Sequence, residues 1–246
     1  MSMRTRGLFV SLEGGEGAGK STVLADLHAR LTAAGHAVLL TREPGGTPLG
    51  ERLRRALLDT QGDAPVAEAE ALLFCAARAH LVNTVLRPAL ARGTVVLCDR
   101  YADSTLAYQG YGRGLPLDQL RTLNALATGG LRPDLTLLLD LPVAEGIARR
   151  RGDSADMDRL DREASDFHER VRAGFRDLAT LEPERWVILD ARRKPSEVAA
   201  EAWSAVAERL GEPGERAQSN RRPIDPTASG QAPGAAASSR DSAPSH

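Results

Sequence analysis

A glycine-rich stretch near the start of the chain limits the possible fold more than any other feature of the sequence. Residues 14–22 read Gly-Gly-Glu-Gly-Ala-Gly-Lys-Ser-Thr, which fits the Gly-x4-Gly-Lys-Ser/Thr pattern of a phosphate-binding loop. In such a loop, backbone N–H groups form an anion cradle at the start of a helix. The apolar run 7–12 before it reads as a buried strand, and Val23, Leu24, Leu27 and Leu31 after it have helical spacing. The stretch therefore predicts a nucleoside-triphosphate site between a strand and a helix.

The loop pattern also assigns roles to single residues. The expected ATP-binding residues are Gly14, Gly15, Glu16, Gly17, Ala18, Gly19, Lys20, Ser21 and Thr22. Lys20 is predicted to reach the β- and γ-phosphates, and the Ser21 hydroxyl to bind Mg²⁺. The alternative is a flexible turn that happens to precede a lysine. Because Lys20 and Lys194 are the only lysines of an arginine-rich chain, a chance match is rare.

Length and composition indicate an ordinary globular protein. The chain has 246 residues, 42% of them hydrophobic and 26% charged, enough for one α/β domain with a full core. A net charge of −1 gives no reason to expect a nucleic-acid-binding surface. Cys75 and Cys98 are expected to pack in the core. With no secretory leader and no apolar run long enough to cross a bilayer, the sequence predicts a cytoplasmic protein without membrane contact.

Short apolar runs alternate with longer helical stretches, which predicts an α/β fold with a five-stranded parallel sheet flanked by helices on both faces. The expected strands are Leu8–Leu12, Ala37–Leu40, Val95–Cys98, Leu135–Leu139 and Trp186–Leu189. The expected helices are Ser21–Ala34, Leu49–Leu58, Val66–Arg92 with a break near His80, Leu117–Thr128, Val143–Arg151, Leu160–Leu181 and Ser196–Leu210. Pro, Gly, Ser and Ala dominate after that, so we expect one domain over 1–210 and a disordered tail over 211–246.

Polar clusters follow the first three expected strands, at the sheet edge where parallel α/β proteins bind ligands. An aspartate that ends a strand beside a phosphate-binding loop is the usual second Mg²⁺-organising group, so Asp99 joins Ser21 in the expected metal site. A helix cap is the alternative for Asp99. Arg100 is suited to bidentate capture of a second phosphate group, with a salt bridge to Asp99 as the alternative.

Four motifs follow the phosphate-binding loop in order. They are Thr-Arg-Glu-Pro-Gly-Gly-Thr at 41–47, Phe-Cys-Ala-Ala-Arg at 74–78, Asp-Arg-Tyr at 99–101 and Ser-Thr-Leu-Ala-Tyr-Gln-Gly at 104–110. With them the chain resembles bacterial thymidylate kinases, phosphate-loop nucleoside monophosphate kinases, from about Gly7 to Leu210. The resemblance implies that the chain transfers the γ-phosphoryl group of ATP to dTMP, with Mg²⁺ as cofactor and a homodimer as the usual assembly.

The resemblance also implies which residues contact dTMP. Phe74 would stack on thymine, and Arg78 would hydrogen-bond the base O4 from the same helix face four residues later. Phe74 reads equally well as a core aromatic on its own. Arg54 and Arg100 match the arginines that hold the dTMP phosphate, and Arg42 is a third candidate. The other expected dTMP contacts are Glu16, Glu43, Pro44, Ser104, Thr105, Tyr108 and Gln109.

Two of these contacts concern the sugar. Tyr108 matches a ring that lies where a ribose 2′-hydroxyl would project, so it would favour deoxyribose. Glu16 matches an acidic position near the sugar 3′-hydroxyl, and a negative charge there is not explained by ATP binding. For Gln109 the alternative is a glycine-rich loop, marked by Gly110, Gly112 and Gly114, whose polar residues are merely solvated.

Residues 148–160 resemble the lid that closes over ATP in this family. Bacterial members without an arginine in the phosphate-binding loop supply transition-state arginines from the lid. Arg149, Arg151 and Arg159 are the candidates here, and they join Lys20 and Arg100 as expected catalytic residues. The alternative is a solvated, charged helix end that needs no ligand.

Two other functions stay open from the residues alone. A deoxynucleoside kinase would need a base for its acceptor hydroxyl, and Glu43 follows the second strand where that base could sit. A phosphate-loop switch or ATP-dependent assembly protein would need only the glycine-rich loop. Two arginines for an acceptor phosphate argue against the first, and the sequence contains no Asn-Lys-x-Asp guanine-reading motif.

Overall fold

The structure, a computed structural model, describes residues 6–60, 63–152 and 158–211, and of residues 151 and 152 it describes the backbone only. Part of the expected lid, 153–157, and the expected tail from residue 212 onward therefore lie outside the described residues.

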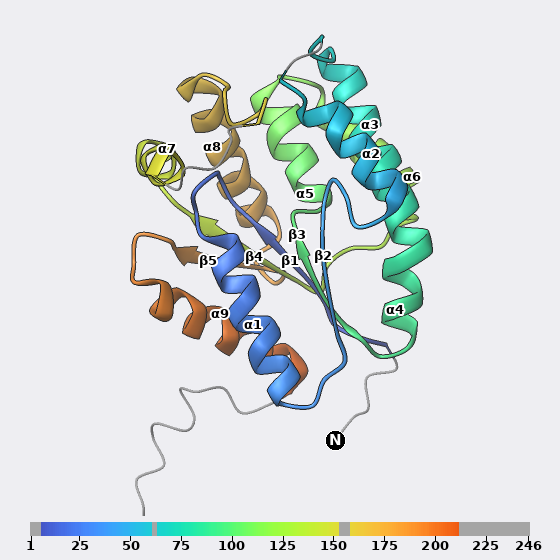
Figure 1. The fold of residues 1–246 in the computed structure, drawn as a ribbon, viewed down its shortest axis with the longest axis vertical. Coiled ribbons are helices and arrows are strands. Elements are labelled where there is room, and N and C mark those ends of the chain that lie inside the picture. The colour runs from blue at the N-terminus through green and yellow to red at the C-terminus, as the bar shows by residue number, and fades with distance from the viewer. Residues whose placement is uncertain (1–5, 61–62, 153–157, 212–246) are drawn as a thin grey trace, which may run out of the picture.

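A five-stranded parallel sheet runs through the centre of the protein (Figure 1). Its strands are β1 (Phe9–Glu13), β2 (Val38–Arg42), β3 (Val95–Asp99), β4 (Leu135–Asp140) and β5 (Trp186–Asp190), in the spatial order β2-β3-β1-β4-β5. The predicted fold class is confirmed. Each strand ends one or two residues later than predicted, because the ladder continues into polar residues; Arg42, for example, is paired with Asp99. Several residues expected just after a strand are thus its last residues, held rigidly by the sheet.

Helices cover both faces of the sheet (Figure 1). The described helical elements are α1 (Lys20–Ala33), α2 (Pro48–Leu58), α3 (Ala67–Leu81), the π-helix η1 (Val82–Leu86), α4 (Arg87–Ala91), α5 (Ala102–Thr105), the π-helix η2 (Leu106–Gly112), α6 (Leu117–Thr128), α7 (Val143–Gly152), α8 (Ser165–Leu181) and α9 (Pro195–Leu210). The apolar faces of α1 and α9 pack on one side of β1 and β4, burying Leu27, Leu31 and Val206 completely. On the other side, Phe167 and Phe175 of α8 pack with Tyr108 of η2. A third cluster, with Phe9 of β1, Val96 of β3 and Leu81 of α3, covers the other side of β1 and β3. Together the three clusters hold the strands between the helices.

The segment 102–112 corrects the sequence analysis, which assigned no helix there and allowed for a glycine-rich loop. It is helical, as α5 followed by η2, and Gln109 is buried rather than solvated. Gly112 is required here by close packing, since a Cβ atom on it would lie 2.6 Å from the Phe167 ring. The glycine marks the tight contact between η2 and α8, not a turn.

The helix predicted over 160–181 begins later than expected, at Ser165. Asp158 explains the delay, because its carboxylate accepts hydrogen bonds from the backbone N–H groups of Leu160 (2.9 Å) and Asp161 (3.0 Å). Such an aspartate turn competes with the helical hydrogen-bond pattern. The break predicted near His80 is the π-helix η1, which begins two residues after it.

One continuous helical stretch of 25 residues among the described residues, Ala67–Ala91, is long and apolar enough to cross a membrane by length and composition alone. The mean hydropathy of its most apolar 18-residue window is 1.2. The expectation that the chain has no such segment is therefore wrong at that level. Its most apolar window is 44% buried within the protein, and the stretch carries the buried charged residues Glu70 and Arg78. The core helices of soluble proteins pass the same test. Buried charged side chains such as Glu70 and Arg78 favour the interpretation of this stretch as a core helix.

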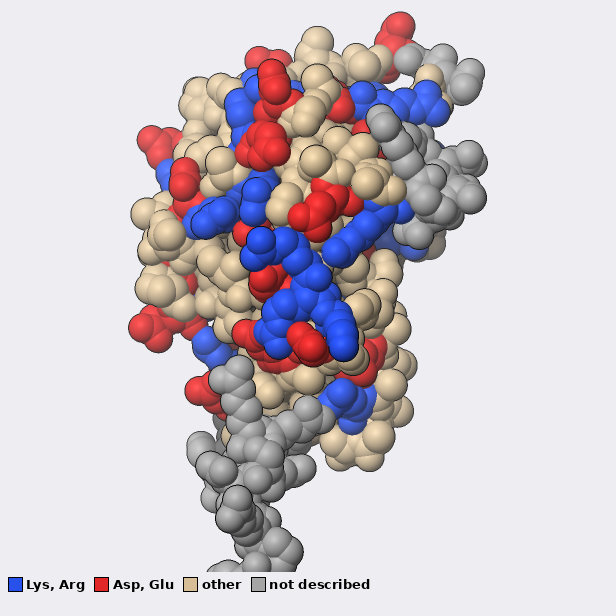
Figure 2. Space-filling model, turned by 90° about the vertical axis from the view of Figure 1, so that its left-hand side faces the viewer, with Lys and Arg blue, Asp and Glu red and all other residues tan. Residues whose placement is uncertain are grey.

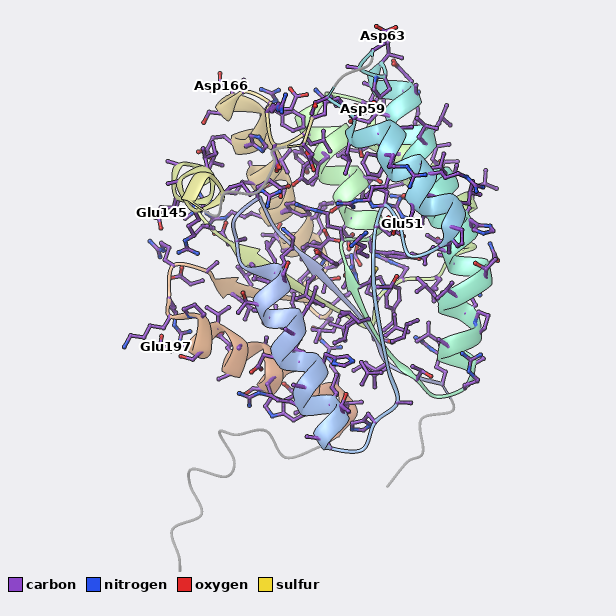
Figure 3. All side chains as sticks on the ribbon, in the orientation of Figure 1. Glu51, Asp59, Asp63, Glu145, Asp166 and Glu197 are labelled. Atoms are coloured by element: carbon purple, nitrogen blue, oxygen red, sulfur yellow. The ribbon has the colours of Figure 1, made fainter. Side chains whose placement is uncertain are left out.

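Charged side chains of both signs cover the surface. Among the acidic residues labelled in Figure 3, Asp63, Glu145, Asp166 and Glu197 lie at the periphery. Arginines gather across the face shown in Figure 2, with acidic side chains between them. A groove on the edge of β5 illustrates the pairing, since Arg172 binds Asp140 (2.7 Å) and Arg192 binds Asp190 (2.9 Å). Charges of both signs are thus interspersed on this face.

Candidate active site

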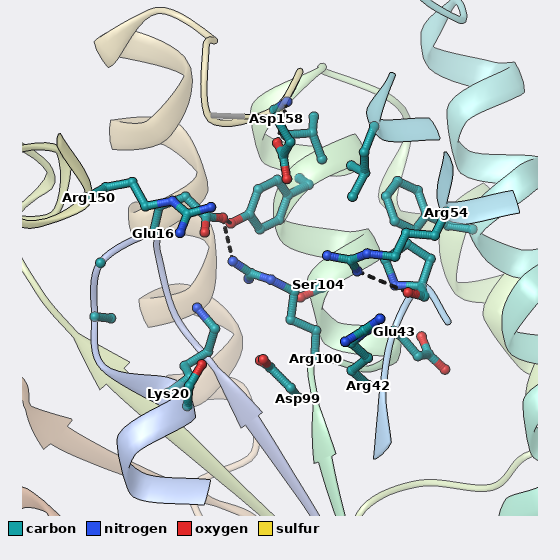
Figure 4. Close-up of a pocket in the computed structure, with 18 of the residues that line it drawn as sticks. Glu16, Lys20, Arg42, Glu43, Arg54, Asp99, Arg100, Ser104, Arg150 and Asp158 are labelled. Atoms are coloured by element: carbon teal, nitrogen blue, oxygen red, sulfur yellow. Dashed lines mark hydrogen bonds and ion pairs between the residues drawn. The ribbon is translucent and has the colours of Figure 1, made fainter. Parts of the chain in front are cut away.

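A pocket of about 370 Å³ lies at the carboxyl ends of β1, β2 and β3 (Figure 4). Most of the sequence-predicted site residues line it together. They are Glu16, Gly17, Ala18, Gly19, Lys20, Ser21, Thr22, Arg42, Glu43, Pro44, Arg54, Phe74, Asp99, Arg100, Ser104, Thr105, Tyr108 and Gln109. Leu58, Arg150, Asp158 and Leu160 complete the wall. Segments spread over more than 140 residues of sequence thus converge on one cavity.

The phosphate-binding loop forms one side of the pocket. Lys20, the first residue of α1, folds back over the loop, and its Nζ donates hydrogen bonds to the carbonyls of Gly14 (3.2 Å) and Gly15 (2.9 Å). Burial and the nearby Arg100 lower the pKa of Lys20, while Glu16, Asp99 and Glu13 oppose that shift. Gly17 has a left-handed φ of 68°, and a Cβ on it would lie 2.3 Å from the Gly146 carbonyl oxygen. The glycine therefore allows the loop to lie directly against α7.

Asp99 and Ser21 both line the pocket beside Lys20, and together they fit a Mg²⁺ ion. The Oδ1 atom of Asp99 is buried and has no hydrogen-bond partner among the described residues. No group of three His, Cys, Asp or Glu side chains in the described part of the chain forms a separate metal site. Mg²⁺ in phosphate-transferring sites usually takes only one or two protein oxygens and completes its shell with phosphates and water. An unpaired carboxylate oxygen and a hydroxyl that line the same pocket meet that requirement.

Arg100, the residue after β3, bridges the two sides of the pocket. Its guanidinium donates to the Gly14 carbonyl (2.9 Å) and to Glu16 (2.5 Å), and lies 4.9 Å from the ring centre of Tyr108. The Tyr108 hydroxyl also donates to Glu16 (2.9 Å). Burial would raise the pKa of Glu16, but Arg100, Lys20 and Tyr108 together lower it to about 2. Glu16 is therefore a fixed anion that holds Arg100 and Tyr108 at the pocket wall.

Two more arginines face the pocket opposite the loop. Arg54 of α2 donates to the backbone carbonyl of Pro44 (3.0 Å; Figure 4). Arg42, at the end of β2, pairs with Glu51 (3.1 Å). Burial and the positive charge of Arg42 lower the pKa of Arg54. Two guanidinium groups close enough to repel each other form an attractive site for an anion.

The far end of the pocket is partly apolar. Phe74 of α3 lines it with Leu58 and Leu160, beside the polar side chains of Thr105 and Gln109. Gln109 is held in place because its amide donates to the buried Glu70 (2.8 Å). A flat aromatic ring with a few fixed polar groups suits a planar heterocycle.

Comparison with known proteins identifies the family. A family model described as thymidylate kinase matches residues 12–202 of the chain. The chain belongs to the thymidylate kinase family. It is 58% identical over 211 residues to the thymidylate kinase of Deinococcus radiodurans, an alignment that covers 83% of this chain and 98% of that protein. It is 56% identical over 200 residues to the thymidylate kinase of Thermomicrobium roseum, covering 81% and 94%. With the thymidylate kinase of Roseiflexus sp. it shares 50% identity over 212 residues, covering 82% and 93%.

Arg78 lies behind the pocket rather than on its wall. It is 1% exposed, and its guanidinium donates to Glu43 (2.7 Å), Thr105 (2.9 Å), Asn124 (2.7 Å) and the Tyr101 carbonyl (3.2 Å). These four partners occupy the guanidinium from every side. In this structure Arg78 thus supports Thr105 and Glu43, which do line the pocket, and does not reach the cavity that a base would occupy.

The expected lid arginines are also placed differently. Arg149 donates to the Ala191 carbonyl (3.0 Å), and Arg159 binds the buried Glu70 (2.5 Å) and the Leu57 carbonyl (2.9 Å). Neither lines the pocket. The side chain of Arg151 lies outside the described residues.

Arg150, which the sequence analysis did not select, does line the pocket and pairs with Asp161 (3.1 Å). Successive helical residues point about 100° apart, so the phase of α7 selects one arginine from the run 149–151. Family motifs gave no signal for Arg150, but the helical phase relative to buried Val143 could have done so.

Proposed function

We propose that this protein transfers the γ-phosphoryl group of ATP to dTMP, giving ADP and dTDP. The observation that carries the proposal is one pocket with the phosphate-binding loop and Lys20 on one side, Arg42 and Arg54 on the other, and Arg100 between them. A site for one nucleotide would need the loop alone. A second set of phosphate-binding cations opposite it is what a monophosphate acceptor requires. The family's name points to the same acceptor.

On the donor side, the loop amides and Lys20 would hold the β- and γ-phosphates. Lys20 must then exchange its carbonyl partners, Gly14 and Gly15, for phosphate oxygens, which are stronger acceptors. Mg²⁺, held by Ser21 and Asp99, would neutralise charge on the phosphates when bound. Catalysis of phosphoryl transfer is mainly alignment and stabilisation of charge on the phosphoryl oxygens.

On the acceptor side, Arg54, Arg100 and Arg42 would bind the dTMP phosphate, and Phe74 would stack on the thymine. Tyr108, buried and bonded to Glu16, would close the space beside the sugar 2′-position, and Glu16 would lie near the 3′-hydroxyl. Glu43, Pro44, Ser104, Thr105 and Gln109 complete this side. A phosphate monoester has its second pKa near about 6, so the acceptor oxygen is largely deprotonated at neutral pH and needs no general base. Arginines that place it are sufficient.

The proposal is tested by mixing the protein with ATP and Mg²⁺ and adding dTMP or thymidine. We expect fast ADP release with dTMP, accompanied by dTDP, and only background ADP release with thymidine. Turnover of thymidine instead would support a deoxynucleoside kinase. ADP release that ignores both additions would support an ATP-dependent switch.

Replacing Arg100 by alanine should chiefly weaken the use of dTMP. Loss of a charge-assisted hydrogen bond to phosphate corresponds to a fall of about 10- to 100-fold in kcat/KM for dTMP, with a smaller change in the KM for ATP. Initial rates at varied dTMP measure this. Arg92→Ala, which removes an exposed arginine outside the pocket, is the matched control. Unchanged dTMP kinetics in the Arg100 variant would contradict its role.

Arg150 joins Arg149, Arg151 and Arg159 as a candidate for stabilising the transferring phosphoryl group. Because Arg150 already lines the pocket while Arg149 is bonded to Ala191, Arg150→Ala should lower kcat by about 10-fold or more and Arg149→Ala by less. Single-turnover rates at saturating ATP and dTMP measure both. The reverse order would assign the role to Arg149.

The rival functions lack comparable support. Glu43, the base that a deoxynucleoside kinase would need, pairs with Arg78 through one carboxylate oxygen at 2.7 Å, and only its Oε1 atom has no hydrogen-bond partner among the described residues. A switch protein has no use for three acceptor-side arginines.

The homodimer and a cytoplasmic location belong to the proposal as well. The exposed Leu72 and Leu126, on the adjacent helices α3 and α6, suit a subunit contact, which sedimentation would test.

A further inference from the structure

Glu13, the last residue of β1, is a carboxylate that the proposed reaction does not use. Its side chain is completely buried and does not line the pocket. One oxygen accepts the backbone N–H of Tyr101 (2.8 Å), and the other accepts the hydroxyl of Ser104 (2.6 Å). Both partners follow β3 and flank the acceptor side of the pocket. Glu13 thus ties the strand that enters the phosphate-binding loop to the segment that carries Arg100.

Arg100 has an unusual backbone conformation at this point. Its φ of 67° makes it the one non-glycine residue with a left-handed φ among the described residues. Such a conformation costs about 1–2 kcal/mol for a residue with a Cβ and persists only where the surroundings hold it. Here the Arg100 N–H donates to the Leu12 carbonyl (2.9 Å) and the next N–H, of Tyr101, donates to Glu13. Adjacent residues of β1 therefore hold the peptide groups on both sides of Arg100.

The direction of the Arg100 side chain depends on this conformation. With it, the guanidinium reaches Gly14 and Glu16 of the phosphate-binding loop and lies over Tyr108. In an ordinary right-handed or extended conformation, the Cα–Cβ bond would leave in another direction and the guanidinium would leave the pocket wall.

We propose that Glu13 is a positioning residue for the acceptor site, which it serves by holding Arg100 in the left-handed conformation that points its guanidinium into the pocket. The proposal rests on the proposed function, since it concerns how the dTMP phosphate is held. It also explains why a carboxylate is buried beside the loop that binds an anionic nucleotide.

The protonation of Glu13 suggests which variant preserves the contact. Burial and the neighbouring Asp103 raise the pKa of Glu13 to about 8, against Ser104, Arg100 and the Tyr101 N–H, which lower it. Near neutral pH the side chain therefore holds a proton for much of the time. Gln is then a close substitute, because its amide can accept from Tyr101 and donate to Ser104.

The test measures KM for dTMP and for ATP in Glu13→Ala, Glu13→Gln and wild type. We expect Glu13→Ala to raise the KM for dTMP about tenfold or more while the KM for ATP stays within about twofold, and Glu13→Gln to remain near wild type. In a double variant that also carries Arg100→Ala, Glu13→Ala should raise the KM for dTMP little further. Both changes remove the same contact, that of the Arg100 guanidinium with the dTMP phosphate. Equal increases in both KM values, additive effects, or a Gln variant as impaired as the Ala variant would overturn the proposal.

Controls separate positioning from general destabilisation. Asp134→Ala removes a carboxylate that accepts a backbone N–H at the other end of β1, from Phe9 (2.8 Å), and should leave the ratio of the two KM values unchanged. If Glu13→Ala does not fold, Glu13→Asp, one methylene shorter, should show the same split to a smaller degree. Hydrogen exchange of the Tyr101 amide should accelerate about tenfold in the Glu13 variant and not in the Asp134 variant. Unchanged exchange overturns the proposal even if dTMP proves not to be the substrate, whereas failure of wild type to form dTDP overturns only the proposed function.

Discussion

Replacing Lys20 by alanine should lower kcat by about 10³-fold at saturating ATP and dTMP. Lys20 is the only cationic side chain in the phosphate-binding loop, and it is buried at the pocket wall, where a charge acts through little water. The loop amides remain in the variant, so ATP should still bind with an affinity reduced far less than the rate. Initial rates measure the loss of kcat, and calorimetry measures the affinity for ATP separately.

The chain supplies a matched control for this prediction, because its second lysine lies outside the pocket. Lys194, exposed just before α9, can be replaced by alanine with the same change of charge, and the rate should stay near wild type. A Lys20 variant that retains more than about a tenth of the wild-type rate would remove the loop lysine from the mechanism.

Replacing Arg78 by alanine should destabilise the protein by about 3–5 kcal/mol, which for a domain of this size lowers the Tm by about 10 °C. The variant leaves Glu43 buried without its cation, and Thr105 and Asn124 lose a donor. Burial already raises the pKa of Glu43, with Arg78 opposing that shift. Without Arg78 the folded pKa rises further above the unfolded value, so the folded protein holds a proton that unfolding releases. Stability of the variant should therefore fall as pH rises from 5 to 8.

Two further variants test that explanation by chemical unfolding. Adding Glu43→Gln to Arg78→Ala should recover part of the lost stability and remove the new pH dependence. Arg121→Ala breaks an exposed pair with Asp118 and should cost below about 1 kcal/mol. If Arg78→Ala costs no more than Arg121→Ala, the buried pair does not organise this part of the site.

The sequence predicted the sheet well because buried parallel strands are short, apolar and separated by helices. It predicted the pocket residues equally well where a motif follows a strand, as for Asp99 and Arg100, since parallel strands bring their carboxyl ends to one edge. Motifs fix position along the chain. They do not fix which way a side chain points. The predictions that differ from the structure concern that direction.

Arg78 illustrates the limit. Its i+4 spacing from Phe74 places the two on one helix face, yet the guanidinium turns to a buried glutamate 35 residues away in sequence. No local pattern carries that pairing. No local pattern indicates the pairing of Arg159 with Glu70 either, since the two are 89 residues apart. Nor does one indicate that Gly112 lacks a side chain because Phe167 packs against it. Each depends on tertiary contacts between segments whose sequences, taken singly, read differently.

The central claim is that one pocket holds two nucleotides with their phosphates facing each other. A crystal structure with dTMP and a non-hydrolysable ATP analogue tests it most directly. We predict the thymine ring against Phe74, the dTMP phosphate on Arg54 and Arg100, and the triphosphate wrapped by residues 14–22 with Lys20 on its terminal phosphates. Triphosphate density in the loop with the space beside Phe74 empty, or dTMP bound elsewhere, would contradict the account.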